Sequence, residues 1–151
     1  MILNIITIDD DIDGILSREA EEVLVEEIPA LGGLIDNMIE TMLSKNGHGI
    51  AAPQVGVSKR IFVLKDGTVC INPKLIAASG KAMHYSEGCM SIKGVRYDVK
   101  RARKVKVSSL GRDGKLGILA PTSKLDNFAI QHELDHLNGI LIKDKCRRRD
   151  V

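Results

Sequence analysis

The chain has 151 residues, of which 44% are hydrophobic and 28% are charged, and its formal net charge is +2. This composition is typical of a globular protein and excludes a disordered or fibrous chain, so we expect residues 1–151 to form a single domain. The small net charge and the scarcity of aromatic residues, with no Trp, argue against a DNA-binding protein, which needs a broad basic surface or aromatic stacking platforms.

Neither a membrane protein nor a disulfide-stabilised one is expected. No apolar run reaches the roughly 20 residues needed to cross a bilayer, and the first segment turns acidic at Asp9 where a signal peptide would stay apolar. We therefore expect a cytoplasmic protein. The three cysteines, Cys70, Cys89 and Cys146, are odd in number and lack CxxC spacing, which favours reduced thiols over disulfides or a structural zinc site.

The first predicted element is a helix. Apolar residues recur every three or four positions from Leu31 to Leu43, which predicts a helix over about 29–45 with one apolar face. Asn46 and Gly47 are typical of a helix end. The segment that follows, GHGIAAPQVG at 47–56, reads as a loop when it is taken alone.

Short β-like runs then replace the helical pattern. They cover residues 61–64, 69–71, 74–79, 104–110 and 115–119. Asp66-Gly67 and the GRDG sequence at 111–114 are hairpin signals between such runs, which favours antiparallel pairing over repeated βαβ crossovers.

A second helix is predicted over about 123–138. Apolar residues and histidines follow a helical period there, Thr122 or Ser123 can cap its start, and Asn138-Gly139 is typical of its end. The expected fold class is therefore α+β, with mainly antiparallel β-sheets packed around this C-terminal helix and with the N-terminal helix over about 29–45.

The strongest chemical signal is the HExxH motif in QHELDHLNG at 131–139. Four residues advance a helix by slightly more than one turn, so His132 and His136 share one face and can bind one metal ion, with Glu133 beside them. Two histidines at this spacing can also be ordinary surface or core residues. That alternative is weaker here because these two of only four histidines lie on the inward face, where unpartnered imidazoles are costly.

A catalytic metal site needs a third protein ligand and one open position. Only fifteen residues follow His136, and they contain neither His nor Glu, so the usual downstream ligand of HExxH proteases is missing from this stretch. Cys89, in EGCMS at 87–91, is the better candidate, although a single thiol is as often a small buried hydrophobe.

Three segments in this order, GHGIAAPQ at 47–54, EGCMS at 87–91 and QHELDH at 131–136, resemble the peptide deformylase family. The resemblance covers most residues from about Leu34 to Asp144. It implies that Cys89, His132 and His136 bind one divalent metal ion. Iron(II) is implied as the native ion, and this ligand set also suits zinc, nickel and cobalt.

The resemblance also implies a reaction, the removal of the formyl group from the N-terminal methionine of nascent polypeptides. It gives Glu133 the role of general acid and base. Gln54 and the backbone N–H of Met90 are implied to stabilise the oxyanion that forms when water attacks the formyl carbon, because fixed donors act best where charge develops. We expect the enzyme to act as a monomer.

Other residues are expected to bind substrate or to orient the ligands. Leu125, Phe128 and Ala129 lie three to seven residues before His132 on the same helix face, so they are expected to form the wall of the methionine pocket, although such residues can be plain core. The remaining candidates are Gly49 and Arg96 for substrate, and Glu87, Arg101 and Asp135 for holding an imidazole in orientation. A surface ion pair is the alternative for the last two.

The chain departs from the family pattern at a few positions. His48 stands where an aliphatic residue is usual, Met90 replaces the commoner leucine, and Lys93 replaces a proline. Arg147, Arg148 and Arg149 could contact ribosomal RNA transiently, although a short charged terminus is more often only solvated. Two other functions remain open at this point, a metalloprotease and a non-catalytic metal-binding or ribosome-associated module.

Overall fold

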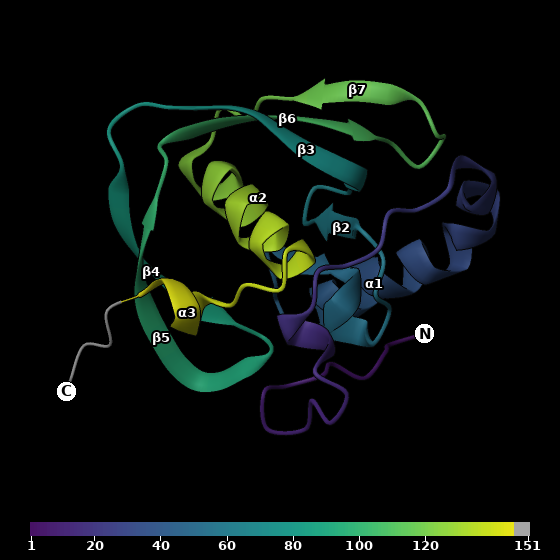
Figure 1. The fold of residues 1–151 in the computed structure, drawn as a ribbon, viewed down its shortest axis with the longest axis horizontal. Helices are drawn as coiled ribbons and strands as arrows, with labels where there is room; N and C mark the ends of the chain where they lie inside the picture. Colours follow the sequence, from purple (N-terminus) through teal and green to yellow (C-terminus); the bar gives the residue numbers. More distant parts are fainter. Residues whose placement is uncertain (147–151) are drawn as a thin grey trace.

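The computed structural model describes residues 1–146, and the predicted ribosome contact at 147–149 lies outside them. The described chain is an α+β fold, as predicted (Figure 1). Its helices are α1 (Gly32–Ser44), α2 (Lys124–Leu137) and α3 (Ile142–Lys145). Short 3-10 helices are η1 (Ile15–Ser17), η2 (Val25–Leu31) and η3 (Ala52–Val55). The strands are β1 (Gly49–Ala51), β2 (Ile61–Leu64), β3 (Val69–Ser79), β4 (Met83–Cys89), β5 (Ile92–Arg101), β6 (Lys104–Leu110) and β7 (Leu116–Leu119).

All strand pairs within the two sheets are antiparallel. The larger sheet has the order β1-β2-β3-β6-β7, and β4 and β5 form a separate two-stranded sheet. The two hairpin turns predicted from Asp66-Gly67 and from 111–114 join β2 to β3 and β6 to β7. Gly67 and Gly114 have positive φ values of 92° and 77°, which glycine adopts without steric cost.

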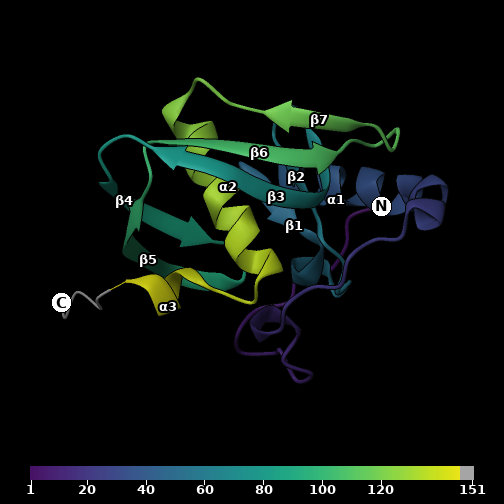
Figure 2. The same cartoon turned by 45° about the horizontal axis from the view of Figure 1, so that its top comes forward.

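Helix α2 lies between the two sheets (Figures 1 and 2). One of its faces packs on the larger sheet, where Ile130, Leu134 and Leu137 join a buried cluster with Phe62 and Val107. Burial of a large aliphatic side chain contributes about 1.5–3 kcal/mol, so this contact fixes the position of the helix. The opposite face of α2 points toward β4 and β5.

Two amide side chains, one buried and one half-buried, fix the rotation and height of α2. Asn127 accepts a hydrogen bond from the backbone N–H of Val105 at 2.8 Å, and Gln131 exchanges two hydrogen bonds of 2.9 Å with the backbone of Ala102. Ser123 caps the helix, since its hydroxyl accepts from the N–H of Asp126 at 3.0 Å. The histidines that follow are therefore held at a defined place relative to the strands.

Several sequence-based boundaries need correction. The first α-helix begins at Gly32 and not near Pro29, because the preceding residues form the 3-10 helix η2. The runs at 69–71 and 74–79 are one continuous strand, β3, whose pairing with β6 shifts register on either side of Lys74. The segment at 47–56 is not only a loop, since it contains β1 and η3.

Among residues 1–146, no helix is both long enough and apolar enough to cross a membrane.

Candidate metal and catalytic site

The structure brings together the three residues that the sequence analysis proposed as metal ligands. One donor atom from each of Cys89, His132 and His136 lies within 4.8 Å of the others. The Nε2 atoms of the two histidines are 3.2 Å apart, and Nε2 of His136 is 3.4 Å from the Cys89 Sγ atom. Cys89 stands at the end of β4, and both histidines lie on the face of α2 that points away from the large sheet.

These donors fit a divalent metal ion. Metal–nitrogen bonds of about 2.0–2.1 Å and metal–sulfur bonds of about 2.3 Å place tetrahedral ligands on the order of 3.3–3.6 Å apart, close to the observed spacing. Glu87 accepts a hydrogen bond from Nδ1 of His132 at 2.8 Å, which leaves Nε2 of this ring as the lone-pair atom that faces the other donors. One thiol and two imidazoles suit zinc or iron better than calcium or magnesium.

Burial and neighbouring charges shift the protonation of both imidazoles. Burial lowers the pKa of His132, but its hydrogen bonds to Cys89 and Glu87 outweigh burial and raise the pKa to about 10. Burial and the positive charge of His132 lower the pKa of His136 well below its ordinary value. A proton and a metal ion compete for the same nitrogen lone pair, so ion binding at His132 would release a proton.

A buried ionic network holds His132 in place. Arg101 is 1% exposed and donates two hydrogen bonds to Glu87, of 2.7 and 2.8 Å, and one to Asp135 of 2.5 Å. Burial opposes the ionised form of Glu87, but its bonds to Arg101 and His132 dominate and lower its pKa to about 2. The carboxylate therefore remains an acceptor that orients the imidazole, and the alternative of a surface ion pair for Arg101 does not hold.

Removal of Arg101 should destabilise the fold strongly. Arg101→Met leaves the buried Glu87 carboxylate without its arginine, and breaking a buried ion pair in this way typically costs about 3–5 kcal/mol. Urea denaturation followed by circular dichroism measures this as a lower free energy of unfolding. The control is Arg103→Met, which removes an exposed arginine two residues away and should change stability by no more than about 0.5 kcal/mol. Equal stability of the two variants would show that the network does not support the site.

Glu133 is buried beside the metal group. It is 3% exposed, and among the described residues its Oε2 atom has no hydrogen-bond partner. Burial raises its pKa to about 7, despite the nearby positive charge of His132. Gly49 leaves space beside the Glu133 carboxylate, because a Cβ atom on Gly49 would lie 2.9 Å from the Glu133 Oε1 atom. A carboxylate held without a partner in such a place is a candidate for proton transfer.

Gln54, in the 3-10 helix η3, lies beside Cys89. Its Oε1 atom accepts from the backbone N–H of Ala51 at 3.0 Å, which orients the amide so that Nε2 points toward Cys89. Nε2 donates to the hydroxyl of Ser91 at 3.2 Å and lies 3.7 Å from the Cys89 Sγ atom. The amide is therefore a fixed donor at the edge of the metal group. Met90 directly follows Cys89 and lines the cavity beside the metal group.

A cavity of about 510 Å³ opens beside these residues. All the side chains and glycines predicted to bind substrate line it, namely Gly49, Leu125, Phe128, Ala129 and Arg96. Phe128 is 2% exposed and belongs to the wall, so its two suggested roles, core residue and pocket wall, are compatible. Of the three residues predicted to orient ligands, Glu87 also lines the cavity, whereas Arg101 and Asp135 stand behind it.

Sequence reasoning missed Tyr85 as a wall residue. Its ring packs against Phe128 with a centroid separation of 4.9 Å, and it lines the cavity from β4. Strand β4 carries MHYSEGC, in which burial alternates from residue to residue, but the buried glutamate Glu87 interrupts its apolar face and hides the strand signal. Lys45 and Asn46 were also missed, because a helix end carries no signal that it borders a cavity.

A metal-ligand group of two histidines from one helix and a cysteine from a strand, with a buried carboxylate beside it, is the site of a metal-dependent hydrolase. The particular family is shown by comparison with known proteins. The chain matches the polypeptide deformylase family over residues 2–151, and it belongs to this family.

Relatives and solved structures agree with this assignment. The peptide deformylase of Desulfitobacterium hafniense is 44% identical over 134 residues, which is 87% of this chain and 88% of that protein. The crystal structure of the Thermotoga maritima peptide deformylase superimposes with a TM-score of 0.88 at 31% identity, over 97% of this chain and 99% of that one. A peptide deformylase from Synechococcus elongatus in complex with actinonin also gives a TM-score of 0.88, at 36% identity over 97% of this chain and 80% of that one.

Proposed function

We propose that this chain hydrolyses the formamide bond at the N-terminal methionine of nascent polypeptides through Glu133, Gln54 and the Cys89–His132–His136 group. The chain is a peptide deformylase by family, and this family consists of metal-dependent hydrolases that remove the N-formyl group. The single observation that carries the residue assignment is the convergence of the three donor atoms within 4.8 Å, beside a buried carboxylate with an unpaired oxygen.

We assign the proton transfers to Glu133. When bound, a divalent ion at this site supplies Lewis-acid chemistry, since it lowers the pKa of a coordinated water to about 7 and polarises a carbonyl. Glu133 accepts the proton of the attacking water at its free Oε2 atom. It then delivers that proton to the nitrogen of the leaving amine, so formate and a free N-terminal amine result. A raised pKa suits a group that must both take and give a proton near neutral pH.

We assign the stabilisation of the oxyanion to fixed hydrogen-bond donors beside Cys89. Attack on the formyl carbon places negative charge on the formyl oxygen, and the Gln54 amide is already oriented by its bond from Ala51. The backbone N–H of Met90 is the second proposed donor. An amide donor keeps its proton at every physiological pH, which a titrating side chain at this place would not do.

The cavity is suited to an unbranched, apolar first side chain. Leu125, Phe128 and Ala129 form one wall from α2, and Gly49 forms the other. Arg96 on β5 stands at the opening, where its guanidinium donates to the carbonyl of Ser86 at 2.7 Å and to the Ser86 hydroxyl at 3.2 Å. We place the formyl-methionine inside the cavity and the following backbone along this opening.

Iron(II) is the ion that we propose as native, with zinc, nickel or cobalt as substitutes. The ligand set accepts all four, and the affinity order alone would favour zinc over iron. We also propose that residues 1–151 act as one catalytic domain, as a cytoplasmic monomer with nascent formyl-methionine peptides as substrates. A transient ribosome contact through 147–149 belongs to the same proposal.

The function is tested on protein purified without oxygen and analysed for bound metal. Formyl-Met-Ala-Ser should release formate and a free amine in equal amounts, whereas acetyl-Met-Ala-Ser, the matched control, should react far more slowly. Cleavage of internal peptide bonds without a preference for the formyl group would identify a metalloprotease instead. Bound metal without hydrolysis of either peptide would identify a non-catalytic metal-binding protein.

His48 should contribute to substrate affinity. Its Nε2 atom is 2.7 Å from Oδ1 of Asp126, so it joins the segment before β1 to the first turn of α2, and it lines the cavity. A partly exposed pair of this kind contributes about 0.2–1 kcal/mol. KM of His48→Val should therefore rise by up to about fivefold relative to the wild type, with little change in kcat. An unchanged KM in this variant would contradict the role of His48 in the cavity wall.

A further inference from the structure

The charged groups around the cavity are sorted by sign between its floor and its opening. The two carboxylates that line it, Glu87 and Glu133, are 5% and 3% exposed and lie at the floor beside the metal group. Lys45 at the end of α1 and Arg96 on β5 also line it, and both are exposed. Substrate that leaves the cavity therefore passes these two cations, which we call the basic rim.

Asp126, in the first turn of α2, already has a hydrogen-bond partner. Asp126 is 2.7 Å from His48, and its side-chain hydrogen bond to that ring lowers its pKa, so it remains ionised and paired. In the same turn of α2, the Lys124 Nζ atom lies 5.8 Å from the centroid of the Phe128 ring. The first turn of α2 thus adds no net negative charge to the basic rim.

Arg96 is also held in a fixed position. Its Nε and Nη2 atoms are both occupied by Ser86, whereas Nη1 would lie 3.2 Å from a Cβ atom on Gly88, a residue that lines the cavity. Among the described residues, the side-chain ion pairs of lysine and arginine do not include Arg96 or Lys45, and they are formed by Lys59, Arg60, Arg101, Arg112, Lys143 and Lys145. Both cations are therefore available to a ligand.

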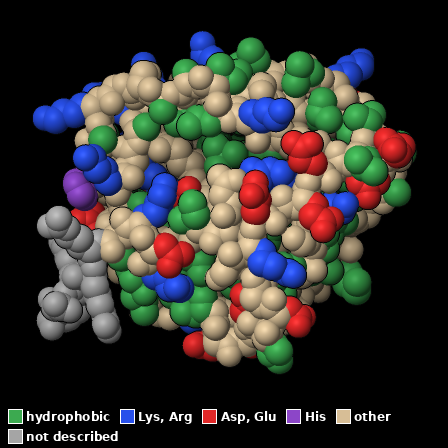
Figure 3. All heavy atoms as spheres, viewed as in Figure 1, with side chains coloured by type: hydrophobic (Ala, Val, Ile, Leu, Met, Phe, Trp, Pro, Cys, Tyr) green, Lys and Arg blue, Asp and Glu red, His purple; other side chains and the backbone are tan. Residues whose placement is uncertain are grey.

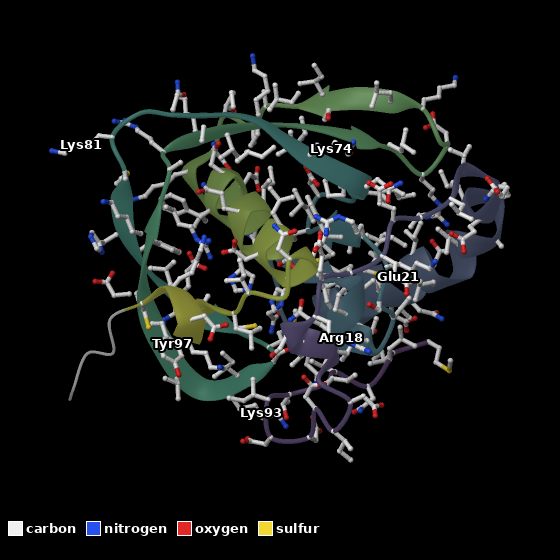
Figure 4. The ribbon with its side chains drawn as sticks, viewed as in Figure 1. Arg18, Glu21, Lys74, Lys81, Lys93 and Tyr97 are labelled. Atoms are coloured by element: carbon white, nitrogen blue, oxygen red, sulfur yellow. The ribbon has the colours of Figure 1, made fainter. Side chains whose placement is uncertain are left out.

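Acidic and basic residues are also unevenly distributed along the chain and over the face shown in Figure 3. Residues 1–40 contain eleven of the 20 Asp and Glu residues and a single Arg, whereas 67–86 and 99–112 contain no Asp or Glu. In Figure 3, Asp and Glu side chains gather toward the right, where the N-terminal segments lie, and Lys and Arg dominate the upper left. Figure 4 shows Lys81, on the turn between β3 and β4, at the outer left, away from Glu21.

We propose that the basic rim selects nascent peptides that carry Asp or Glu directly after the formyl-methionine. This proposal rests on the proposed function, because it assumes that the formyl-methionine binds inside the cavity and that the following residues lie along its opening. An acidic side chain at this second position would lie near Lys45 and Arg96, whereas a basic one would be repelled by them. Exposed charge pairs contribute about 0.2–1 kcal/mol each, so two cations should give a preference of roughly tenfold over a basic residue.

The test compares kcat/KM for formyl-Met-Glu-Ser, formyl-Met-Gln-Ser and formyl-Met-Lys-Ser at low salt. The order Glu, Gln, Lys is expected, and the difference should shrink at about 0.5 M salt, where the screening length falls well below the roughly 10 Å of dilute buffer. Lys45→Glu should reduce or reverse the order. Lys74→Glu, which changes an exposed lysine on β3 that does not line this cavity, should leave the order as in the wild type.

Two outcomes would overturn the proposal, namely equal kcat/KM for the Glu and Lys peptides at low salt, or a preference that Lys45→Glu and Lys74→Glu change equally. The neutral Gln peptide separates this proposal from the proposed function. If it is hydrolysed and no charge preference is seen, only the basic rim fails. If none of the three peptides is hydrolysed, the proposed function fails with it.

Discussion

Replacing Cys89 by alanine should abolish metal binding and hydrolysis together. The Cys89 Sγ atom is one of three donors within 4.8 Å, and the other two are imidazoles from a single helix. Loss of residues that only orient a ligand typically lowers metal affinity or activity by about 10–100-fold, so loss of the thiolate itself should cost more than about 100-fold. Metal content after dialysis and formate release from formyl-Met-Ala-Ser measure the two effects.

Cys146→Ala is the matched control for this substitution. Cys146 is also partly buried, but its Sγ atom donates to the backbone carbonyl of Lys143 at 3.8 Å and its side chain packs against an apolar cluster, and it does not belong to the group of metal donors. This variant should keep one ion per chain and full activity. If Cys89→Ala retained its metal as well as Cys146→Ala does, the third ligand would have to be another residue.

Glu133→Gln should lose activity without losing stability, and this combination distinguishes a catalytic carboxylate from a structural one. The amide keeps the size of the side chain but cannot accept the proton of water, so kcat should fall by about 10²–10⁴-fold. A buried carboxylate oxygen without a partner is costly to the fold. The free energy of unfolding should therefore stay the same or increase.

Metal content must be measured alongside, because an inactive protein without metal would say nothing about proton transfer. We expect one ion per chain in Glu133→Gln, as in the wild type. Glu22→Gln, which changes an exposed glutamate near the N-terminus, should affect neither activity nor stability. Unchanged hydrolysis in Glu133→Gln with metal retained would exclude Glu133 as the proton carrier.

Local patterns carried enough information to predict the second helix and several strands. Helix α2 follows a regular apolar period and has a Ser cap at its start, so its boundaries at Lys124 and Leu137 lie within one residue of the prediction. Strands β2 and β6 were predicted with their observed bounds. Asp66-Gly67 correctly marked the hairpin between β2 and β3, because a glycine with positive φ is specific to few turn types.

Tertiary contacts decided what local patterns could not. Strands β4 and β5 are half exposed and rich in polar residues, and the buried ion pair between Glu87 and Arg101 joins them where an apolar pattern would be expected. The position of α2 depends on Asn127 and Gln131, whose amides bond to backbone atoms far along the chain. No spacing rule indicates such partners in advance.

Some residues of the candidate site were likewise predictable from local spacing, and others were not. The HExxH spacing alone brings His132 and His136 to one helix face, whereas the choice of Cys89 came from the family resemblance and from the lack of a downstream His or Glu. The sorting of charge between floor and opening was not visible in the sequence, because Lys45, Arg96 and Glu87 come from three separate elements.

X-ray absorption spectroscopy of the zinc-loaded protein reports directly on the atoms bound to the ion. A centre formed by Cys89, His132 and His136 should show one sulfur at about 2.3 Å and nitrogen or oxygen neighbours at about 2.0–2.1 Å from the ion. In Cys89→Ala, any residual zinc should show no sulfur neighbour. A wild-type spectrum without sulfur at bonding distance would contradict a metal centre built from Cys89, His132 and His136.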